Sequence, residues 1–346
     1  MRTAPHVLVA RLDNEGDVLL SGPAVRAVAA GAGRVTLWCG PRGEAAARLL
    51  PGVDDVVVHE APWIDPEPAP VSREATLGLV DRLAGLAVDQ AIVLTSFHQS
   101  ALPAALLLRL AGVPTVAAMS EDYPGSLLDV RHPRDDNLHE VERALSLVAT
   151  LGYRLPPGDD ARLAIRRRQQ SWPRPSGWER YVVVHPGATV PARAWGPERN
   201  AALVDALVEQ GQRVVVTGSG KERRLTARVA GPARASVVDL GGRTDLEQLG
   251  EVVAGADVVV VGNSGPAHLA AAVGTPVVSL FAPTVPPRWW RPWGVPHVLL
   301  GQHDIACAGC RARACPVPGH PCLSAVSVHE VLAAVGTLAP MEVAAP

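Results

Sequence analysis

The sequence predicts an α/β protein made of two Rossmann-like, doubly wound domains that face each other across a cleft. Its length of 346 residues suits two domains of roughly 150 residues each. Short β-rich runs alternate with helical stretches in both halves, as expected for parallel sheets covered by helices on both faces. Residues 152–180, rich in Pro, Arg and Trp, interrupt this alternation. We therefore place an N-terminal domain at 1–155, a linker at 156–180 and a C-terminal domain at 181–346.

The N-terminal half alternates predicted strands and helices along the chain. Short apolar runs predict strands at 6–11, 35–39, 53–59, 90–94 and 115–118. Helices are expected over 17–30, 100–111 and 138–150. A polar stretch over 121–137 is expected to be a long loop, and loops of that length are usually functional or mobile.

The C-terminal half repeats the alternation after a short charged helix expected over 161–170. Strands are predicted at 181–185, 213–217, 236–240, 257–261 and 277–281. Helices are expected over 197–210, 222–230, 245–254, 267–273 and 327–335. In sheets of this kind ligands bind at the carboxyl ends of the strands, which is why we expect a ligand cleft between the two domains.

Composition and charge exclude several function classes. Hydrophobic residues make up 48% of the chain and the net charge is −2, so a basic field for nucleic acid is lacking. No apolar run reaches the roughly 18 residues that a membrane span requires. Residues 1–6 lack the pattern of a signal peptide. We expect a cytoplasmic protein without nucleic-acid partners.

The first notable turn, at residues 12–17, joins the opening strand to a helix. Gly16 permits a tight turn, and Asp17 follows it. Aspartate is favoured as a helix N-cap, typically by ~1 kcal/mol. The spacing alone therefore favours a cap over a catalytic base, and a functional interpretation of Asp17 needs further residues.

Three turns in the C-terminal half follow predicted strands, at residues 185–189, 217–222 and 262–268. Small residues at helix starts leave backbone N–H groups available, and with the helix dipole they form an anion site suited to a pyrophosphate. Tight chain connections alone would explain one such turn. Three of them in one half favour a nucleotide-binding domain.

The fingerprints of other nucleotide-binding and hydrolytic folds do not fit these turns. Residues 218–220 lack the third glycine of the dinucleotide motif and the spacing of a phosphate-binding loop. Ser264 is not in a hydrolase nucleophile elbow, because Gly265 follows it directly. Dehydrogenase, P-loop ATPase and α/β-hydrolase functions are therefore disfavoured.

Several motifs occur together in a consistent order over nearly the whole chain. They lie at residues 16–20, 140–143, 184–188, 195–197, 240–246, 265–272 and 274–278. Their combination resembles glycosyltransferase family 9, which includes the heptosyltransferases of lipopolysaccharide core synthesis. The resemblance implies a GT-B fold and an inverting, metal-independent transfer that needs no cofactor. It also implies that the first domain binds most of the acceptor and the second most of an ADP-sugar.

The resemblance assigns two catalytic residues. Asp17 matches the family's catalytic aspartate, which takes a proton from the acceptor hydroxyl as that oxygen attacks the anomeric carbon. Arg193 lies where the family usually has a lysine, two residues before Trp195, and is expected to stabilise charge on the leaving pyrophosphate. An ordinary solvated arginine is the alternative interpretation of Arg193.

The expected donor-binding residues lie in the three turns of the C-terminal half: Gly187, Ala188, Thr189, Glu222, Asn263, Ser264, Gly265 and His268. Glu222 matches an acidic residue that accepts hydrogen bonds from ribose hydroxyls. His268 is expected to order its turn or pack its helix rather than to transfer protons. Asn263 departs from the pattern, because many family members carry Asp there in contact with the donor sugar. A hexose or a modified heptose is therefore an open alternative.

The acceptor side is less distinctive. Candidate acceptor-binding residues are Gly16, Asp122, Tyr123, Arg131 and Arg134. Basic residues in the long loop could bind a phosphate or carboxylate of the acceptor, and a solvated loop is the alternative. The expected partners are a nucleotide sugar and a glycan, glycolipid or small-molecule acceptor. We expect a monomer, with peripheral contact at the inner face of the cell membrane as one option.

Four of the five cysteines crowd into one segment: Cys307, Cys310, Cys315 and Cys322. In a cytosolic chain such crowding points to a metal or to reduced thiols before disulfides. The spacing could supply four thiolates to a structural zinc ion, ahead of an iron–sulfur cluster, although it is not the common double C-x2-C pattern. Reduced, packed thiols are the alternative.

Other functions stay open at this point. A glycosyltransferase that uses another nucleotide hexose, for natural-product or envelope glycans, is the nearest alternative. A GT-B-like sugar-nucleotide epimerase would need a different acid–base set, which the Gly16-Asp17 opening disfavours. A non-catalytic sugar-nucleotide binder is disfavoured because Asp17 and the donor turns are both present.

Overall fold

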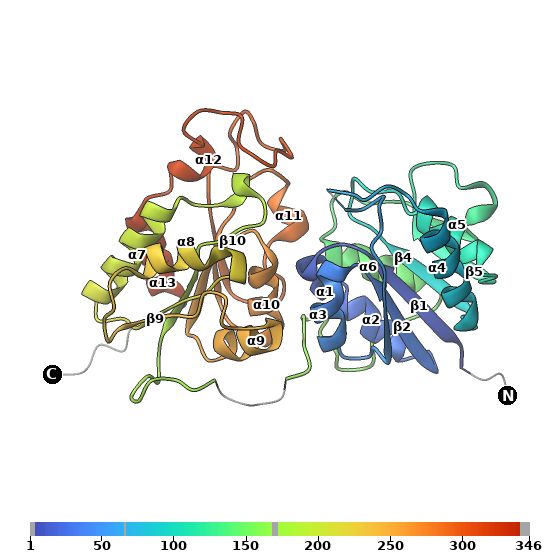
Figure 1. Ribbon diagram of the computed structural model, residues 1–346, viewed down its shortest axis with the longest axis horizontal. Helices are drawn as coiled ribbons and strands as arrows, with labels where there is room; N and C mark the ends of the chain where they lie inside the picture. The colour runs from blue at the N-terminus through green and yellow to red at the C-terminus, as the bar shows by residue number, and fades with distance from the viewer. Residues whose placement is uncertain (1–3, 66, 168–171, 340–346) are drawn as a thin grey trace. The chain divides into compact units, whose positions relative to one another are not determined.

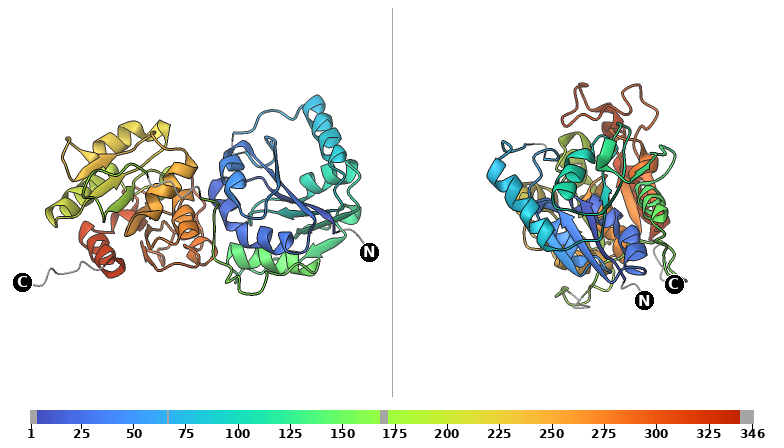
Figure 2. Two further views of the ribbon diagram at one scale, coloured as in Figure 1. Left: turned by 90° about the horizontal axis from the view of Figure 1, so that it is seen from below. Right: turned by 90° about the vertical axis from the view of Figure 1, so that its right-hand side faces the viewer.

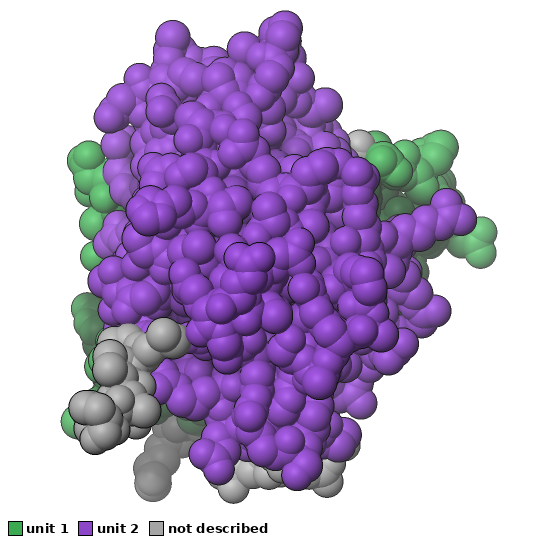
Figure 3. All heavy atoms as spheres, turned by 90° about the vertical axis from the view of Figure 1, so that its left-hand side faces the viewer, with its two compact units in different colours: residues 1–166 green, residues 167–346 purple. Residues whose placement is uncertain are grey.

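The computed structural model describes residues 4–65, 67–167 and 172–339, and the chain divides into two compact units. Unit 1 covers residues 1–166 and unit 2 covers residues 167–346, as coloured in Figure 3. The division falls inside the stretch predicted as a linker, of which residues 168–171 lie outside the described residues. Each unit has its own sheet (Figure 1). Each also has its own clusters of buried hydrophobic side chains.

Unit 1 contains a six-stranded sheet with the strand order β3-β2-β1-β4-β5-β6, and every pair is parallel. Its strands are β1 (His6–Arg11), β2 (Arg34–Cys39), β3 (Asp55–Val58), β4 (Gln90–Leu94), β5 (Thr115–Met119) and β6 (Val130–His132). Its α-helices are α1 (Glu15–Leu20), α2 (Gly22–Ala29), α3 (Glu44–Leu49), α4 (Arg73–Gly85), α5 (Leu102–Leu110) and α6 (Glu140–Thr150). The strand order reverses between β1 and β4, and ligands bind at such switch points.

Helices cover both faces of this sheet, because alternate strand residues are buried on opposite sides. Leu8 and Ala91 belong to one cluster with Leu83 of α4 and Leu108 of α5. The other face is covered by α2 and α6, which contact each other as well as β2 and β5 (Figure 2).

Unit 2 repeats the same topology with the order β12-β11-β10-β7-β8-β9, again with parallel pairs only. Its strands are β7 (Val182–His185), β8 (Val214–Val216), β9 (Val237–Asp239), β10 (Val258–Gly262), β11 (Val277–Leu280) and β12 (His297–Leu300). Its α-helices are α7 (Pro197–Glu209), α8 (Arg223–Ala230), α9 (Leu246–Ala254), α10 (Gly265–Val273), α11 (Pro287–Trp290), α12 (Pro321–Ser324) and α13 (Val328–Leu338). The switch point lies between β7 and β10.

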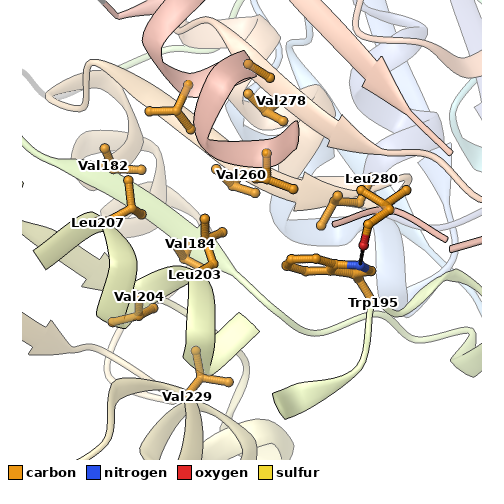
Figure 4. Close-up of a cluster of buried hydrophobic side chains, with 14 of the residues drawn as sticks. Val182, Val184, Trp195, Leu203, Val204, Leu207, Val229, Val260, Val278 and Leu280 are labelled. Atoms are coloured by element: carbon orange, nitrogen blue, oxygen red, sulfur yellow. Dashed lines mark hydrogen bonds between the residues drawn. The ribbon is translucent and has the colours of Figure 1, made fainter. Parts of the chain in front are cut away.

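The two faces of the unit 2 sheet bury separate cores. On one face Val184 and Val260 pack with Leu203 of α7 and with side chains of α8 and α13 (Figure 4). On the other face Val183 and Val259 pack against α9 and α10. Strands buried on both faces are typically runs of β-branched residues, which explains the valine-rich sequences of β7, β8 and β10.

The predicted α/β class with two Rossmann-like, doubly wound halves is confirmed, and each predicted strand is found within two residues of its expected bounds. The expectation of an unbroken loop over 121–137 is wrong. That stretch contains the 3-10 helix η2 (Gly125–Leu127) and the edge strand β6. β6 escaped prediction because only three of its residues pair, and they pair with one neighbour.

Two helix predictions are also wrong. The helix expected over 17–30 is divided into α1 and α2 at Ser21, since Pro23 lies in the first turn of α2 and cannot supply the N–H of a continuous helix. The helix expected over 161–170 is not formed by residues 161–167, and its remaining residues lie outside the described ones. Instead, the N–H of Arg166 donates to the carbonyl of Leu49, 2.7 Å away in unit 1.

Some elements lie outside the predicted ones, namely α3, α4, α11, α12 and β12. The amphipathic pattern of α4 is weak, since only Leu79, Val80 and Leu83 of its residues are buried. None of the helices within the described part of the chain combines the length and apolar character that a membrane crossing requires.

We predict that Leu108→Ala destabilises unit 1 far more than Leu106→Ala. Both residues lie in α5, but Leu108 is 0% exposed and Leu106 is 46% exposed. The buried change leaves a cavity and should lower the free energy of unfolding by about 2–5 kcal/mol, against about 0.5 kcal/mol or less at the exposed position. Urea unfolding followed by circular dichroism measures both losses, and equal losses would contradict the assigned core.

Candidate active site

Three predicted turns meet at the carboxyl ends of adjacent strands in unit 2. β7 lies between β8 and β10 in the sheet. The turns that follow these strands therefore lie at one edge, where the strand order reverses. Nδ1 of His185 and Oγ1 of Thr217 form a hydrogen bond of 2.9 Å, which ties the ends of β7 and β8 together.

Glu222 lies against the first of these turns. A side chain at Gly187 would overlap the Glu222 carboxylate, so this close approach requires glycine. Oε2 of Glu222 accepts hydrogen bonds from the backbone N–H and the hydroxyl of Ser219, both 2.7 Å long. Burial lowers the pKa of the neighbouring His185, and the Glu222 carboxylate opposes that shift. A half-buried carboxylate is thus fixed beside Gly187 and its turn.

The third turn leads into α10. Ser264 is the N-cap of this helix, Gly265 is its first residue, and no side chain caps it. Asn263 is 6% exposed, and its Nδ2 donates to the carbonyl of Ala282 over 3.4 Å. Its Oδ1 is buried without a hydrogen-bond partner among the described residues. His268 lies buried one turn into α10.

The 3-10 helix η3 (Pro191–Arg193) brings Arg193 to the same edge. The backbone oxygen of Arg193 lies 2.8 Å from the position of a Cβ at Gly262, so the packing of η3 on β10 also requires glycine. Nε of Arg193 donates to Oγ1 of Thr284, 3.3 Å away in the loop after β11. Thr189, by contrast, is an exposed residue of its turn.

In unit 1 one buried guanidinium joins four side chains at the carboxyl end of β1. Arg11 is 3% exposed. Its Nε lies 2.8 Å from Oδ2 of Asp13, and its Nη2 lies 3.1 Å from Oδ1 of Asp17. Nη1 lies 3.4 Å from Oε2 of Glu140 in α6, and Nη2 donates to Oγ of Ser96 over 3.0 Å.

Asp17 is the third residue of α1, and its interpretation as the N-cap is wrong. The N-cap is Asn14, a residue type equally favoured there, with extended backbone angles of φ −81° and ψ 170°. Gly16 is buried in the first turn. The Asp17 side chain is 19% exposed, so the carboxylate reaches the surface while Arg11 holds one of its oxygens.

Burial dominates the pKa values of the other acids in this network. Burial raises the pKa of Asp13 to about 6, with Arg11 acting against the shift and Asp17 adding to it. Burial likewise raises the pKa of Glu140, against the lowering effect of Arg11 and Arg143. Burial alone would lower the pKa of Arg11, but the carboxylates of Asp13, Asp17 and Glu140 outweigh it and raise that pKa. Arg11 therefore stays charged.

A cavity of about 280 Å³ opens beside this network. Its lining includes Arg11, Glu140 and Arg143 together with the loop over residues 95–100, which follows β4. Two predicted acceptor-binding residues, Asp122 and Arg134, also line it. The cavity is therefore bounded by both cations and carboxylates.

The other candidate acceptor residues lie elsewhere in unit 1. Tyr123 is 85% exposed and does not line the cavity. The guanidinium of Arg131 donates to the backbone oxygens of Ser120, at 2.9 Å, and of Glu121, so it braces the loop after β5. Gly16 is part of α1.

The four clustered cysteines are free thiols and line one small cavity of about 20 Å³ together with His320. Four cysteines can line one cavity without their sulfur atoms being arranged around a single metal position. Within residues 4–65, 67–167 and 172–339, no group of three or more His, Cys, Asp or Glu side chains is arranged to hold a metal ion. The structure thus gives no support to the structural zinc expected from the cysteine spacing.

Four residues of the network around Arg11 were not predicted from the sequence: Arg11, Asp13, Ser96 and Glu140. Arg11 offered a usable signal, because a charged residue that ends a buried strand must find partners of opposite charge. Glu140 lies in one of the family motifs, at residues 140–143, but its contact with Arg11 gave no sequence signal, because the two residues are 129 positions apart along the chain.

Comparison with known proteins identifies the family. The model described as glycosyltransferase family 9 (heptosyltransferase) matches residues 77–320. The match includes every strand of unit 2 and the second half of unit 1, whereas the turn that carries Asp17 precedes it.

Curated relatives and solved structures agree with this match. Lipopolysaccharide heptosyltransferase 3 of Escherichia coli is 32% identical over 170 residues, which are 44% of this chain and 47% of that protein. Lipopolysaccharide heptosyltransferase 1 of Pseudomonas aeruginosa is 32% identical over 238 residues, or 66% and 64% of the two chains. The matches thus span 47% and 64% of these relatives. The structure titled E. coli ADP-heptose lps heptosyltransferase II shares the fold, with a TM-score of 0.71, 21% identity and coverage of 96% and 98%.

We predict that Asp13→Asn removes a pH dependence from the stability of unit 1. The pKa of Asp13 is about 6 in the folded state and 3.8 without the fold, so the folded state binds this proton more tightly. The stability contributed by this proton is fully present below the unfolded pKa and is lost as the pH rises through the folded pKa.

Urea unfolding at several pH values between the two pKa values measures this effect as a difference between wild type and variant. Burial lowers the pKa values of His59 and His132, but these groups are the same in both proteins and cancel in the difference. A wild-type-minus-variant difference that does not change with pH would refute the assignment.

Proposed function

Because the chain belongs to glycosyltransferase family 9, we propose that it moves a heptose or a related sugar from an ADP-sugar to a hydroxyl group. The observation that carries the proposal is the meeting of the glycine-rich turns with Glu222 and Arg193 at one sheet edge of unit 2. That edge combines backbone donors, a carboxylate and a cation. A nucleoside diphosphate is recognised by groups of these kinds.

The proposed donor complex uses all three turns. The diphosphate lies at the N-terminus of α10, where Gly265 is the first helical residue and its backbone N–H, together with the helix dipole, favours an anion. The N–H of Ser264 donates to the carbonyl of Gly262 over 2.9 Å and so shapes the turn. Ala188 and Thr189 contact the phosphates from the turn after β7. Glu222 accepts hydrogen bonds from the ribose hydroxyls, for which its fixed, half-buried carboxylate is suited.

An ADP-sugar is the proposed donor because the relatives are named heptosyltransferases and one of them is described with ADP-heptose. Asn263 faces the sugar in this proposal. Its buried Oδ1 lacks a protein partner and is suited to accept a hydrogen bond from a sugar hydroxyl. Because an amide carries no charge, a hexose or a modified heptose is the alternative donor.

Asp17 is the proposed catalytic base. The acceptor oxygen attacks the anomeric carbon and its proton passes to the Asp17 carboxylate, while the bond to the diphosphate breaks on the opposite side of the sugar. This course inverts the anomeric configuration. Arg193 and the N-terminus of α10 stabilise the charge that develops on the diphosphate, so we propose a transfer without a metal ion.

The acceptor is proposed to bind in the 280 Å³ cavity of unit 1, where Asp122 and Arg134 offer polar contacts. A glycan, a glycolipid or a small molecule that carries an anionic group would suit this lining. We further propose that the protein acts as a monomer in the cytoplasm, with contact at the inner face of the membrane when the acceptor is lipid-linked.

Binding and product analysis test the donor and the stereochemistry. Calorimetric titration with ADP, UDP and GDP should give the tightest binding for ADP. Nuclear magnetic resonance of the product should show the anomeric configuration opposite to that of the donor. Preference for UDP or GDP would overturn the ADP-sugar assignment, and retention would overturn the single-displacement mechanism.

We predict that Asp17→Asn lowers kcat by roughly 10²–10⁴-fold, because the amide cannot accept the acceptor proton. ADP affinity should stay unchanged, since Asp17 lies in unit 1 and the donor turns lie in unit 2. Glu15→Gln is a matched control, because Glu15 is an acid in the same turn of α1 that lacks a contact with Arg11 among the described ion pairs. If the Asp17→Asn variant transferred sugar with a kcat close to that of the wild type, Asp17 would not be the catalytic base.

A further inference from the structure

The cysteine-rich segment, residues 301–324, forms a closed loop between β12 and α13 (Figure 1). The N–H of Gln302 donates to the carbonyl of Cys322 over 2.9 Å, so the two ends of the segment meet. Arg311 and His320 have left-handed backbone angles, with φ values of 55° and 50°. Residues other than glycine keep this conformation where their surroundings hold it. The segment is therefore shaped by its contacts.

One of these contacts holds η3 at Ala192 from two sides. The N–H of Ala192 donates to the carbonyl of Arg313 over 3.0 Å. Nε2 of His320 lies 3.1 Å from the carbonyl oxygen of Ala192. A carbonyl oxygen only accepts, so the imidazole must donate from Nε2. Both polar backbone groups of the residue before Arg193 are thus bound by the segment.

A second contact holds the loop after β11, which carries the side-chain partner of Arg193. The N–H groups of Gly309 and Arg311 donate to the carbonyls of Pro283 and Thr284, over 2.6 and 2.9 Å. Thr284 in turn accepts the hydrogen bond from Nε of Arg193. The segment therefore binds both loops that meet at the Arg193 guanidinium.

A third contact lies just beyond the segment. The carbonyl of Val326 accepts hydrogen bonds from Nε1 of Trp195, over 3.2 Å, and from Nη1 of Arg199, over 2.7 Å. The Trp195 bond is drawn as a dashed line in Figure 4. The chain is thus held on both sides of Arg193, at Ala192 and at Trp195.

We propose that the cysteine-rich segment is a positioning element that sets Arg193 for the leaving diphosphate, with the His320 bond to Ala192 as its main contact. This proposal rests on the proposed glycosyl transfer. The cavity lined by the four cysteines is also lined by Ala192 and Thr284, so it lies between the segment and the two loops that it holds. Cysteine side chains are small enough to line such a narrow space, and Cys322 is buried there.

Preorganisation is the physical reason for such an element. A cation stabilises developing charge best when its position is set before the reaction. Arg193 is the last residue of a 3-10 helix of only three residues, which has few hydrogen bonds of its own to fix the direction of the side chain. A displacement of about 1 Å can cost about 100-fold in rate. The segment would prevent that displacement from outside the turn.

A double-mutant cycle tests the proposal. His320→Ala should lower kcat roughly 10- to 100-fold with a smaller change in the KM for the donor, because charge on the diphosphate develops mainly in the transition state. In an Arg193→Ala background the same change should have almost no further effect, since the positioned group is gone. His320→Gln should recover much of the activity, because its amide can donate to the Ala192 carbonyl.

His297→Ala is the matched control. His297 in β12 also lies within hydrogen-bond distance of a backbone carbonyl, that of Val295 at 2.9 Å, but takes no part in the three contacts described. The His297→Ala variant should keep the kcat of the wild type, even if the substitution lowers the melting temperature of the protein. Circular dichroism melting of every variant establishes that the assays report on folded protein.

Losses from His320→Ala that are equal in the wild-type and Arg193→Ala backgrounds would overturn the proposal. So would a His320→Gln variant that matches the melting temperature of wild type but the low kcat of His320→Ala. A wild-type protein that binds ADP but transfers no sugar would instead count against the proposed function. In that case the dissociation constant for ADP replaces kcat as the quantity measured in the double-mutant cycle. His320→Ala should then weaken ADP binding in the wild-type background and have almost no further effect in the Arg193→Ala background.

Discussion

The parallel pairing of β7 with β8 and β10 is the constraint on which the candidate donor site depends. It brings three turns that are far apart in sequence to one edge of the unit 2 sheet. Glycine at 187 then lets the Glu222 carboxylate lie against the first turn, and glycine at 262 lets η3 lie on the end of β10. The site is therefore built from backbone proximity, to which Glu222 and Arg193 add one charge of each sign.

In unit 1 the carboxyl end of the corresponding strand, β1, is organised by ion pairs. A buried charge without partners destabilises a fold by several kcal/mol, and Arg11 avoids this by meeting Asp13, Asp17 and Glu140. The same contacts tie β1, α1 and α6 together, so the proposed base is fixed by the fold of the whole unit. In unit 2 the cysteine-rich segment holds the two loops beside Arg193, and it does so with hydrogen bonds to their backbone groups and not with ion pairs.

The fold was largely predictable because its signals are local. Valine-rich runs marked the strands, and glycines such as Gly187 and Gly265 marked the turns at their ends. The Arg11 network was not predictable, since Glu140 and Ser96 reach Arg11 only through tertiary packing. The cysteine spacing indicated where four thiols gather, since they line one cavity, but it could not indicate the hydrogen bonds that the backbone around them makes with neighbouring loops. The split of the opening helix at Ser21 followed from Pro23, a local signal that was overlooked.

A structure of the protein with ADP bound tests the central claim most directly. The account predicts that the diphosphate lies at the N-terminus of α10 beside Ser264 and Gly265, with the ribose hydroxyls within hydrogen-bond distance of Glu222 and with Arg193 next to the phosphates. ADP bound away from the turns after β7, β8 and β10, or diphosphate oxygens without contact to either α10 or Arg193, would contradict it.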